Sequence, residues 1–148
     1  MRIYADTSFL ASLYLVGDAH HGRAVAALQG WRGAPQLPLT PFGAVELENT
    51  FARLHHAGRL RAAEVRALMA TVKADVGTGL LRSAPLRAYE WLEQSRDLAR
   101  RITPQTGTRT LDCLHLALAR MERATSFATY DANQRRAATA AGFVVLPV

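Results

Sequence analysis

Residues 1–8 read MRIYADTS, and this opening contains the passage from a short apolar strand into a helix that orients the rest of the chain. The apolar run stops at Asp6, and apolar residues at helical spacing begin at Phe9. A strand that leads into a helix through a carboxylate places this carboxylate at the C-terminal end of the strand, and ligands bind at that edge of an open α/β sheet. The alternative is that Asp6 only caps the following helix, as Asp, Ser and Thr commonly do.

Length and composition indicate one ordinary globular domain spanning residues 1–148, long enough to bury a core. Hydrophobic residues make up 49% of the chain and charged residues 20%. The longest uncharged run, residues 33–45, contains prolines and is too short to span a bilayer, and Asp6 interrupts the opening too early for a signal peptide. The single cysteine, Cys113, excludes an internal disulfide and fits a reducing compartment. We therefore expect a cytoplasmic protein that does not enter a membrane.

The charge balance is strongly basic, with a net charge of +6. Of the 18 basic residues only Lys73 is a lysine. A basic protein favours polyanions such as nucleic acid. An arginine-rich composition with ordinary surface ion pairs accounts for the charge equally well, because net charge bears on association and not on fold.

The hydrophobic periodicity predicts the element order β-α-α-β-α-α-(β)-α-α-β-α-β. Strands are expected at residues 3–5, 36–40, 126–129 and 143–146, with a strand or loop at 80–82; helices are expected after Asp6 and at about 19–29, 41–56, 61–75, 85–102, 111–123 and 131–141, separated by turns that include 30–35 and 103–108. Thr40 and Thr110 are the expected caps of two of these helices. This alternation predicts an α/β fold, with a mostly parallel sheet of four to five strands flanked by helices on both faces.

Four acidic residues are expected at one edge of this sheet. Asp6 and Asp131 each end a strand and begin a helix, so in a parallel sheet both lie at the same edge. Asp112 lies in the first turn of the helix before the strand that leads to Asp131, and Glu46 lies in the second turn of the helix after the second strand. All four side chains can therefore converge on one cleft.

Carboxylates crowded without a countercharge repel one another, and some of them would have to take up protons. A divalent cation removes that cost, and a ligand set made only of oxygens suits Mg²⁺ or Mn²⁺ better than zinc. Such a site can activate water for in-line attack on a phosphodiester. Basic side chains around it would hold the backbone of a nucleic acid.

Four short motifs occur in an order that is typical of one family. They are IYADTS at 3–8, AVEL at 44–47, DCLHLA at 112–117 and FATYD at 127–131, the last followed by a helix of small residues, Gly142 and a final strand. With these motifs the chain resembles a PIN domain and, within that family, a VapC-type toxin ribonuclease of a bacterial toxin–antitoxin module. The resemblance covers essentially the whole chain, and it implies a parallel sheet flanked by helices.

The resemblance also implies the site residues and the chemistry. The catalytic and metal-binding quartet would be Asp6, Glu46, Asp112 and Asp131, with supporting hydroxyls at Ser8 and Thr129. It implies cleavage of RNA with Mg²⁺ or Mn²⁺, a homodimer, and inhibition by a cognate VapB-type antitoxin. Cys113 departs from the family pattern, where a small alanine is common.

Several residues have a second interpretation. Capping accounts for Ser8 and Thr129 as well as a role in the site does, and Arg109 could bind substrate phosphate or be an ordinary surface arginine. His115 lies beside an apolar stripe, which favours a buried histidine over a general base. Cys113 has no evident base beside it to make it a nucleophile.

Two rival functions and one interface prediction stay open at this point. The chain could be a catalytically silent nucleic-acid-binding or regulatory module that keeps its acids. It could also be a receiver-like domain with a phosphate-accepting aspartate, although Lys73 lies in the middle of a helix and not where such a domain needs a lysine. The apolar residues of helices 19–29 and 61–75 are the candidate surfaces for a dimer.

Overall fold

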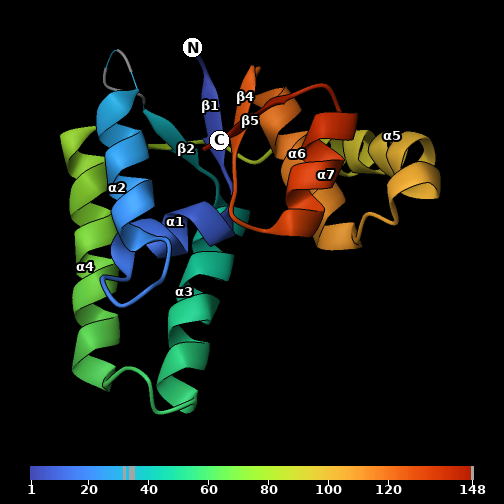
Figure 1. Cartoon of the computed structure of the whole chain (residues 1–148). Helices are drawn as coiled ribbons and strands as arrows, with labels where there is room; N and C mark the ends of the chain where they lie inside the picture. The colour runs from blue at the N-terminus through green and yellow to red at the C-terminus, as the bar shows by residue number, and fades with distance from the viewer. Residues whose placement is uncertain (32, 34–35, 148) are drawn as a thin grey trace.

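A computed structural model describes residues 1–31, 33 and 36–147 of the chain. The elements are β1 (Ile3–Ala5), α1 (Thr7–Tyr14), α2 (His21–Gly30), β2 (Leu37–Leu39), α3 (Pro41–His56), α4 (Ala62–Thr78), β3 (Leu81–Ser83), α5 (Ala88–Thr106), α6 (Thr110–Met121), β4 (Ser126–Ala128), α7 (Ala132–Ala140) and β5 (Val144–Leu146) (Figure 1). The predicted element order is confirmed, and the uncertain third strand is present as β3. The turn expected at 30–35 includes residues 32, 34 and 35, which lie outside the described part.

All strand pairs are parallel, as predicted. β4 lies between β1 and β5, with Ala5 opposite Ala128, while β2 pairs with β3. β2 also lies next to β1 (Figure 1). Leu37 donates its N–H toward β3 and Leu39 accepts from Ala84, so the nitrogen of Pro38 faces the other side, toward β1. Because proline has no N–H, it cannot continue the hydrogen-bond ladder there, and the five strands divide into groups of three and two.

The two faces of β1 contact different groups of helices. Ile3 and Ala5 point into a core that contains buried residues of α1 to α4, such as Phe9 and Leu47. Tyr4 points to the opposite face, into a second core built from α5, α6 and α7. This alternation follows from the two-residue period of a strand. Helices therefore cover both faces of the sheet, as the sequence predicted (Figure 1).

Some expected core positions and helix ends are wrong. Apolar residues at helical spacing in 85–102 and 111–123 predict that Tyr89, Leu92 and Leu111 lie in the core. In the structure these residues are 83%, 51% and 54% exposed. α5 also continues through Pro104 to Thr106 and ends at Gly107, whose φ of 65° is left-handed, so most of the loop expected at 103–108 is helical. The outer face of α5 packs on nothing in the described chain, which is why helical spacing overestimated its burial.

The candidate dimer surfaces of α2 and α4 are largely used inside the chain itself. Ala24 and Val72 are buried in the first core, and Leu28, Leu68 and Met69 pack against it.

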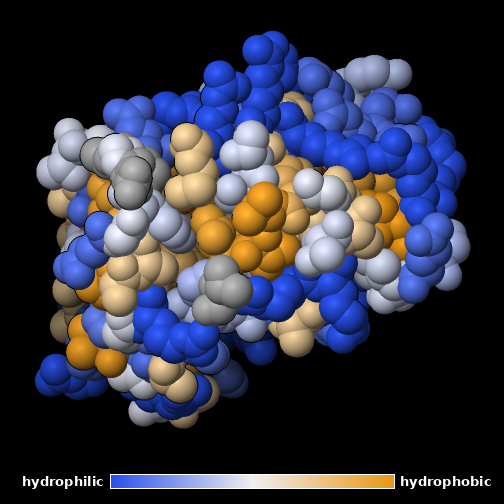
Figure 2. Space-filling model, turned by 45° about the horizontal axis from the view of Figure 1, so that its top comes forward, coloured by the Kyte–Doolittle hydropathy of each residue, from blue (hydrophilic) through white to orange (hydrophobic). Residues whose placement is uncertain are grey.

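Elsewhere, a band of hydrophobic residues crosses the face seen in Figure 2, between rims of hydrophilic residues. Within the described residues no helix is both long and apolar enough to cross a membrane.

Candidate active site

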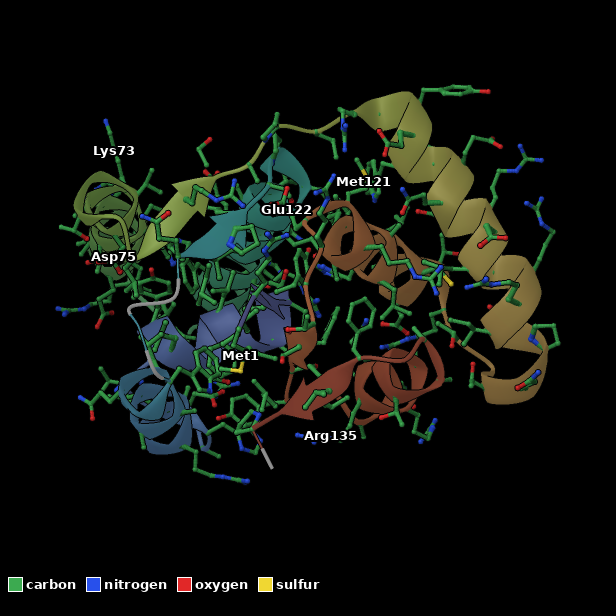
Figure 3. All side chains as sticks on the ribbon, turned by 90° about the horizontal axis from the view of Figure 1, so that it is seen from above. Met1, Lys73, Asp75, Met121, Glu122 and Arg135 are labelled. Atoms are coloured by element: carbon green, nitrogen blue, oxygen red, sulfur yellow. The ribbon has the colours of Figure 1, made fainter. Side chains whose placement is uncertain are left out.

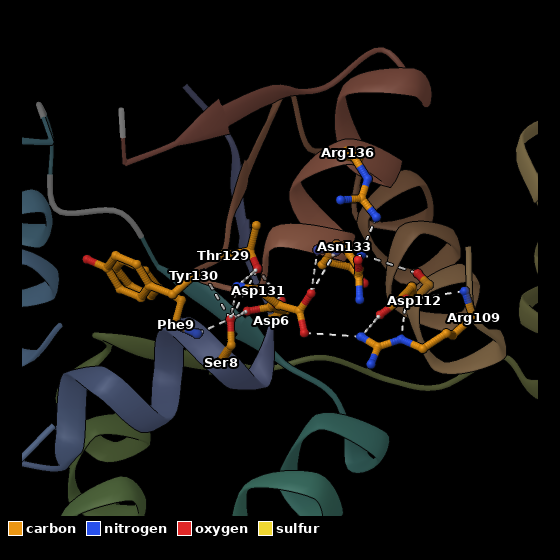
Figure 4. Close-up of polar contacts among 11 residues, drawn as sticks. Asp6, Ser8, Phe9, Arg109, Asp112, Thr129, Tyr130, Asp131, Asn133 and Arg136 are labelled. Carbon is orange, nitrogen blue, oxygen red and sulfur yellow. Dashed lines mark hydrogen bonds and ion pairs between the residues drawn. The ribbon is translucent and has the colours of Figure 1, made fainter. Parts of the chain in front are cut away.

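Asp6 sits where the parallel ladder ends. Its N–H donates to the carbonyl of Ala128 (3.1 Å), and the side chain caps α1 by accepting from the N–H of Phe9 (3.0 Å). Two hydroxyls also donate to the carboxylate: Ser8 Oγ to Oδ1 (2.7 Å) and Thr129 Oγ1 to Oδ2 (2.6 Å) (Figure 4). Capping and site placement are therefore not alternatives for Asp6, because the same carboxylate does both.

Ser8 and Thr129 join the two strand ends. Their hydroxyl oxygens lie 3.1 Å apart, and Thr129 Oγ1 accepts from the N–H of Asp131 (3.0 Å). Asp131 caps α7, accepting through Oδ1 from the N–H groups of Asn133 (2.7 Å) and Gln134 (3.0 Å). One network of hydroxyl groups thus fixes the backbone that carries both Asp6 and Asp131 (Figure 4).

Asp112 is buried at the start of α6 and is held by Arg109. The N-cap of this helix is Arg109 and not Thr110, which is the first helical residue. Arg109 Nε donates to Asp112 Oδ2 (2.9 Å), and Nη2 donates to Asp112 Oδ1 (3.2 Å) and to Asp131 Oδ2 (3.1 Å) (Figure 4). The guanidinium therefore bridges two of the four predicted acids.

Glu46 reaches the site from α3 and is held from two sides. Thr7 Oγ1 donates to its Oε2 (2.8 Å), and His115 Nε2 lies 2.5 Å from the same oxygen. The other ring nitrogen of His115 lies 2.8 Å from the hydroxyl of Tyr4. Sequence patterns favoured a buried histidine, which the 5% exposure of His115 confirms, but they missed its contact with Glu46.

The four acids line one cleft of about 410 Å³ at the C-terminal edge of the sheet. The charged and polar residues around it are Asp6, Thr7, Ser8, Glu46, Arg109, Thr110, Asp112, His115, Asp131 and Gln134. As the described side chains lie, no three His, Cys, Asp or Glu residues are grouped closely enough to surround one metal ion. Among the described residues that line the cleft, Arg109 is the arginine that supplies positive charge.

Burial and local hydrogen bonds shift the acids in opposite directions. Burial raises the pKa of Asp6 above its usual value, although His115 and the hydrogen bonds from Thr129, Phe9 and Ser8 oppose the change. Burial also raises the pKa of Glu46, but His115 and Thr7 outweigh it, so the net shift is downward. The pKa of Asp131 is likewise lowered, because hydrogen bonds from α7 and Arg109 exceed the effect of burial.

The donor set fits a hard divalent cation. All four acids offer oxygen ligands, and Mg²⁺ accepts one or two protein carboxylates while keeping several waters, so it does not need a tight cage of three side chains. Asp6 is buried with a raised pKa, which shows that its charge is not fully compensated. Arg109 already supplies positive charge between Asp112 and Asp131, as a cation there would.

Gln134 is a site residue that sequence analysis missed. It is 1% exposed, lines the acidic cleft and donates through Nε2 to the carbonyl of Asp112 (3.3 Å). Its Oε1 is buried without a hydrogen-bond partner among the described residues. Such an atom is uncommon, because buried polar groups are usually hydrogen-bonded. Its position one helical turn after Asp131 was the available signal.

Comparison with known proteins identifies the family. The PIN domain family model matches residues 3–140 of the chain. The chain therefore belongs to the PIN domain family. No curated protein matches it significantly.

Two solved structures share the fold. VapC20 of Mycobacterium tuberculosis, described as a sarcin-ricin loop cleaving toxin, superposes with a TM-score of 0.69 at 23% identity, covering 96% of each chain. FitAcB of Neisseria gonorrhoeae superposes with a TM-score of 0.70 at 19% identity, covering 98% of this chain and 96% of the other. At these identities the likeness extends to the fold.

Proposed function

We propose that this PIN domain is a divalent-metal-dependent endoribonuclease and the toxin of a bacterial toxin–antitoxin module. The observation that carries the proposal is the convergence of Asp6, Glu46, Asp112 and Asp131, from four separate elements, on one cleft beside Arg109. The likeness to VapC20, described as a sarcin-ricin loop cleaving toxin, supports the proposal. RNA is found in the cytoplasm, so a toxin of this kind would act there.

In this proposal the acids hold Mg²⁺ or Mn²⁺ at the edge of the sheet. When bound, the cation would activate water and stabilise the charge that develops on the phosphodiester. Asp6 and Asp131 are fixed by the shared hydroxyls of Ser8 and Thr129, so these two carboxylates need little reordering to bind a ligand. The pKa values of Glu46 and Asp131 are lowered, so both carboxylates are ionised at neutral pH, as binding of a metal ion requires.

Arg109 is the candidate phosphate-binding residue. Its side chain is 57% exposed at the cleft, and a guanidinium can donate two parallel hydrogen bonds to a phosphate. A cation that binds Asp112 and Asp131 would replace Arg109 as their countercharge. The guanidinium would then be available to the RNA backbone on the solvent side of the cleft.

An antitoxin would have a suitable surface beside the acids. A groove of about 710 Å³ runs between α1, α3 and α4, and Ser8 and Asp131 line both this groove and the acidic cleft. A partner segment seated in the groove would therefore end next to the site. We infer that a cognate antitoxin binds there and that the toxin is a homodimer.

The test is cleavage of total RNA by the purified protein with Mg²⁺, with Mn²⁺ and with EDTA, beside Asp112→Asn. We expect cleavage that needs the metal and disappears in the variant, and growth arrest on expression of the wild type only. Metal-independent cleavage, or cleavage that survives Asp112→Asn, would contradict the proposal.

The second candidate is a silent nucleic-acid-binding module. The bridge from Arg109 to Asp112 and Asp131 favours it, because it pairs two of the acids with a positive charge without a metal. Tight RNA binding without metal binding or cleavage would support this alternative. The receiver-like alternative has no support, since Lys73 lies on α4 and points away from the sheet (Figure 3).

A further inference from the structure

Glu46 is connected to the protein core by a buried pair, His115 and Tyr4. His115 Nε2 lies 2.5 Å from Glu46 Oε2, and His115 Nδ1 lies 2.8 Å from the hydroxyl of Tyr4. The three residues come from α3, α6 and β1, and Tyr4 is 111 positions from His115 in sequence. A buried histidine needs only local packing, whereas His115 also makes hydrogen-bond contacts with side chains of two other elements.

The imidazole ring is held rigidly in place. Its centroid lies 5.9 Å from the ring of Tyr4, in an edge-to-face arrangement, and 5.1 Å from the ring of Phe42. His115 is 5% exposed and Tyr4 is 2% exposed. Because neither ring can rotate without losing these contacts, the position of Nε2 is set by the core and not by the cleft.

The two contacts of His115 favour a hydrogen on Nε2. A tyrosine hydroxyl is protonated at neutral pH, so Tyr4 has a hydrogen to donate to Nδ1. If Tyr4 donates to Nδ1, then Nε2 must carry the ring hydrogen, and it donates to Glu46. The tautomer with hydrogen only on Nδ1 would leave Nε2 and the carboxylate as two facing acceptors.

We propose that Tyr4 and His115 are positioning residues that hold Glu46 in place for its role in the acidic cleft. Among the described residues, the side-chain hydrogen bonds to Glu46, from Thr7 and His115, both end on Oε2. Oε1 is therefore left to bind the cation. A glutamate side chain without these contacts would lose rotamer freedom when it binds a cation. The hydrogen bonds from Thr7 and His115 restrict Glu46 before the cation binds, so this entropic cost is smaller. The inference rests on the proposed function, in which Glu46 is a metal ligand.

The first measurement is ¹⁵N NMR of the histidine side chains in the metal-free protein, which reports the tautomer directly. We expect His115 of the wild type to carry its hydrogen on Nε2. In Tyr4→Phe the ring keeps its packing but loses the hydrogen bond to Nδ1, so the Nδ1 resonance should shift while Glu46 keeps the hydrogen on Nε2. A wild-type ring protonated only on Nδ1 would overturn the proposal, since such a ring cannot donate to Glu46.

The second measurement is Mn²⁺ affinity by calorimetry for Tyr4→Phe, His115→Gln and His115→Leu. Loss of a partner that orients a metal ligand typically weakens metal binding roughly 10- to 100-fold, and we expect His115→Leu in this range. His115→Gln keeps an amide donor and should recover part of the loss. The control is Tyr14→Phe, because Tyr14 also donates to a carboxylate, Asp75 Oδ2 (2.7 Å), but does not line the acidic cleft.

The outcomes separate this inference from the proposed function. Variants that fold, by circular dichroism, and bind Mn²⁺ as tightly as the wild type would overturn the positioning role and leave the proposed function intact. A wild type that binds no Mn²⁺ would overturn the proposed function and the positioning role with it. Equal weakening by Tyr14→Phe would assign the effect to general destabilisation and would also contradict the inference.

Discussion

Arg109 Nη2 lies 3.1 Å from Asp131 Oδ2, although the two residues are 22 positions apart in the sequence. The same guanidinium also holds Asp112 through two hydrogen bonds. One side chain at the edge of the cleft thus supplies the positive charge that keeps two predicted metal ligands together. A divalent cation and Arg109 would compete for the same carboxylates.

Replacing Arg109 should tighten metal binding. In Arg109→Gln, Asp112 and Asp131 lose their countercharge, and a cation no longer has to displace the guanidinium. We expect Mn²⁺ affinity by calorimetry to rise roughly threefold to tenfold, a modest effect because solvent screens the exposed side chain. RNA binding should weaken, with the slope of log affinity against log salt reduced by about one charge.

Arg61→Gln is the matched control for this prediction. Arg61 is also the N-cap of a helix and also pairs with an acid three residues later, Glu64, but it does not line the acidic cleft. It should leave metal and RNA affinity unchanged. Weaker Mn²⁺ binding by Arg109→Gln would show that the arginine supports the metal site and does not compete with it.

Asp6→Asn should abolish cleavage and stabilise the metal-free protein at neutral pH. Burial raises the pKa of Asp6, so the folded protein binds this proton more tightly than the unfolded chain does. The contribution of Asp6 to stability therefore falls as the pH rises from its unfolded pKa, about 3.9, through its folded pKa. Asparagine carries no charge to bury and still caps α1.

We expect the Tm of Asp6→Asn near pH 7 to exceed that of the wild type, since each kcal/mol of stability raises Tm by roughly 2–4 °C in a protein of this size. Thermal unfolding at pH 4 and pH 7 in EDTA measures it, and the gain should shrink at the lower pH. A variant less stable than the wild type at pH 7 would show that the carboxylate is well compensated without metal.

Two substitutions at Asp131 separate its cap from its proposed role in the site. Asp131→Ala removes the acceptor for the N–H groups of Asn133 and Gln134, so it should cost about 1 kcal/mol in stability. Asp131→Asn keeps an acceptor and should cost less. Both variants should lose metal-dependent cleavage. If Asp131→Asn retains full cleavage, Asp131 is only a helix cap.

Metal should stabilise the protein in proportion to its binding. A ligand that binds only the folded state at 100 times its Kd adds about 2.7 kcal/mol to the free energy of unfolding. We expect Tm to rise with Mg²⁺ or Mn²⁺ over EDTA in the wild type, and much less in Asp112→Asn. The same rise in both proteins would place the ion outside the acidic cleft.

Cys113→Ala should retain full activity. The thiol is 3% exposed and does not line the acidic cleft, and its hydrogen-bond contact is with Thr103 Oγ1 at 3.8 Å. The loss of a small buried group should cost about 1 kcal/mol. A steady-state cleavage assay measures the activity, and a large loss in a folded variant would give the thiol a role that the structure does not show.

The sequence alone determined the order of the elements and the edge at which the acids lie. Strand periodicity followed by a capping carboxylate is a local pattern, so Asp6 and Asp131 could be placed at the ends of β1 and β4 before any tertiary contact was known. The parallel direction of the strands then follows from the alternation of strands and helices. The pairing of Ala5 with Ala128 is seen only in the structure.

Only the tertiary structure decided which side chains touch. The bridge from Arg109 to Asp131, the contact of His115 with Glu46 and the partnerless Oε1 of Gln134 depend on rotamers and on how α3, α6 and α7 pack. Helical spacing likewise could not show that Tyr89 and Leu111 face outward. Periodicity identifies the apolar face of a helix, but burial depends on which other elements cover that face, and these are brought together by long-range packing.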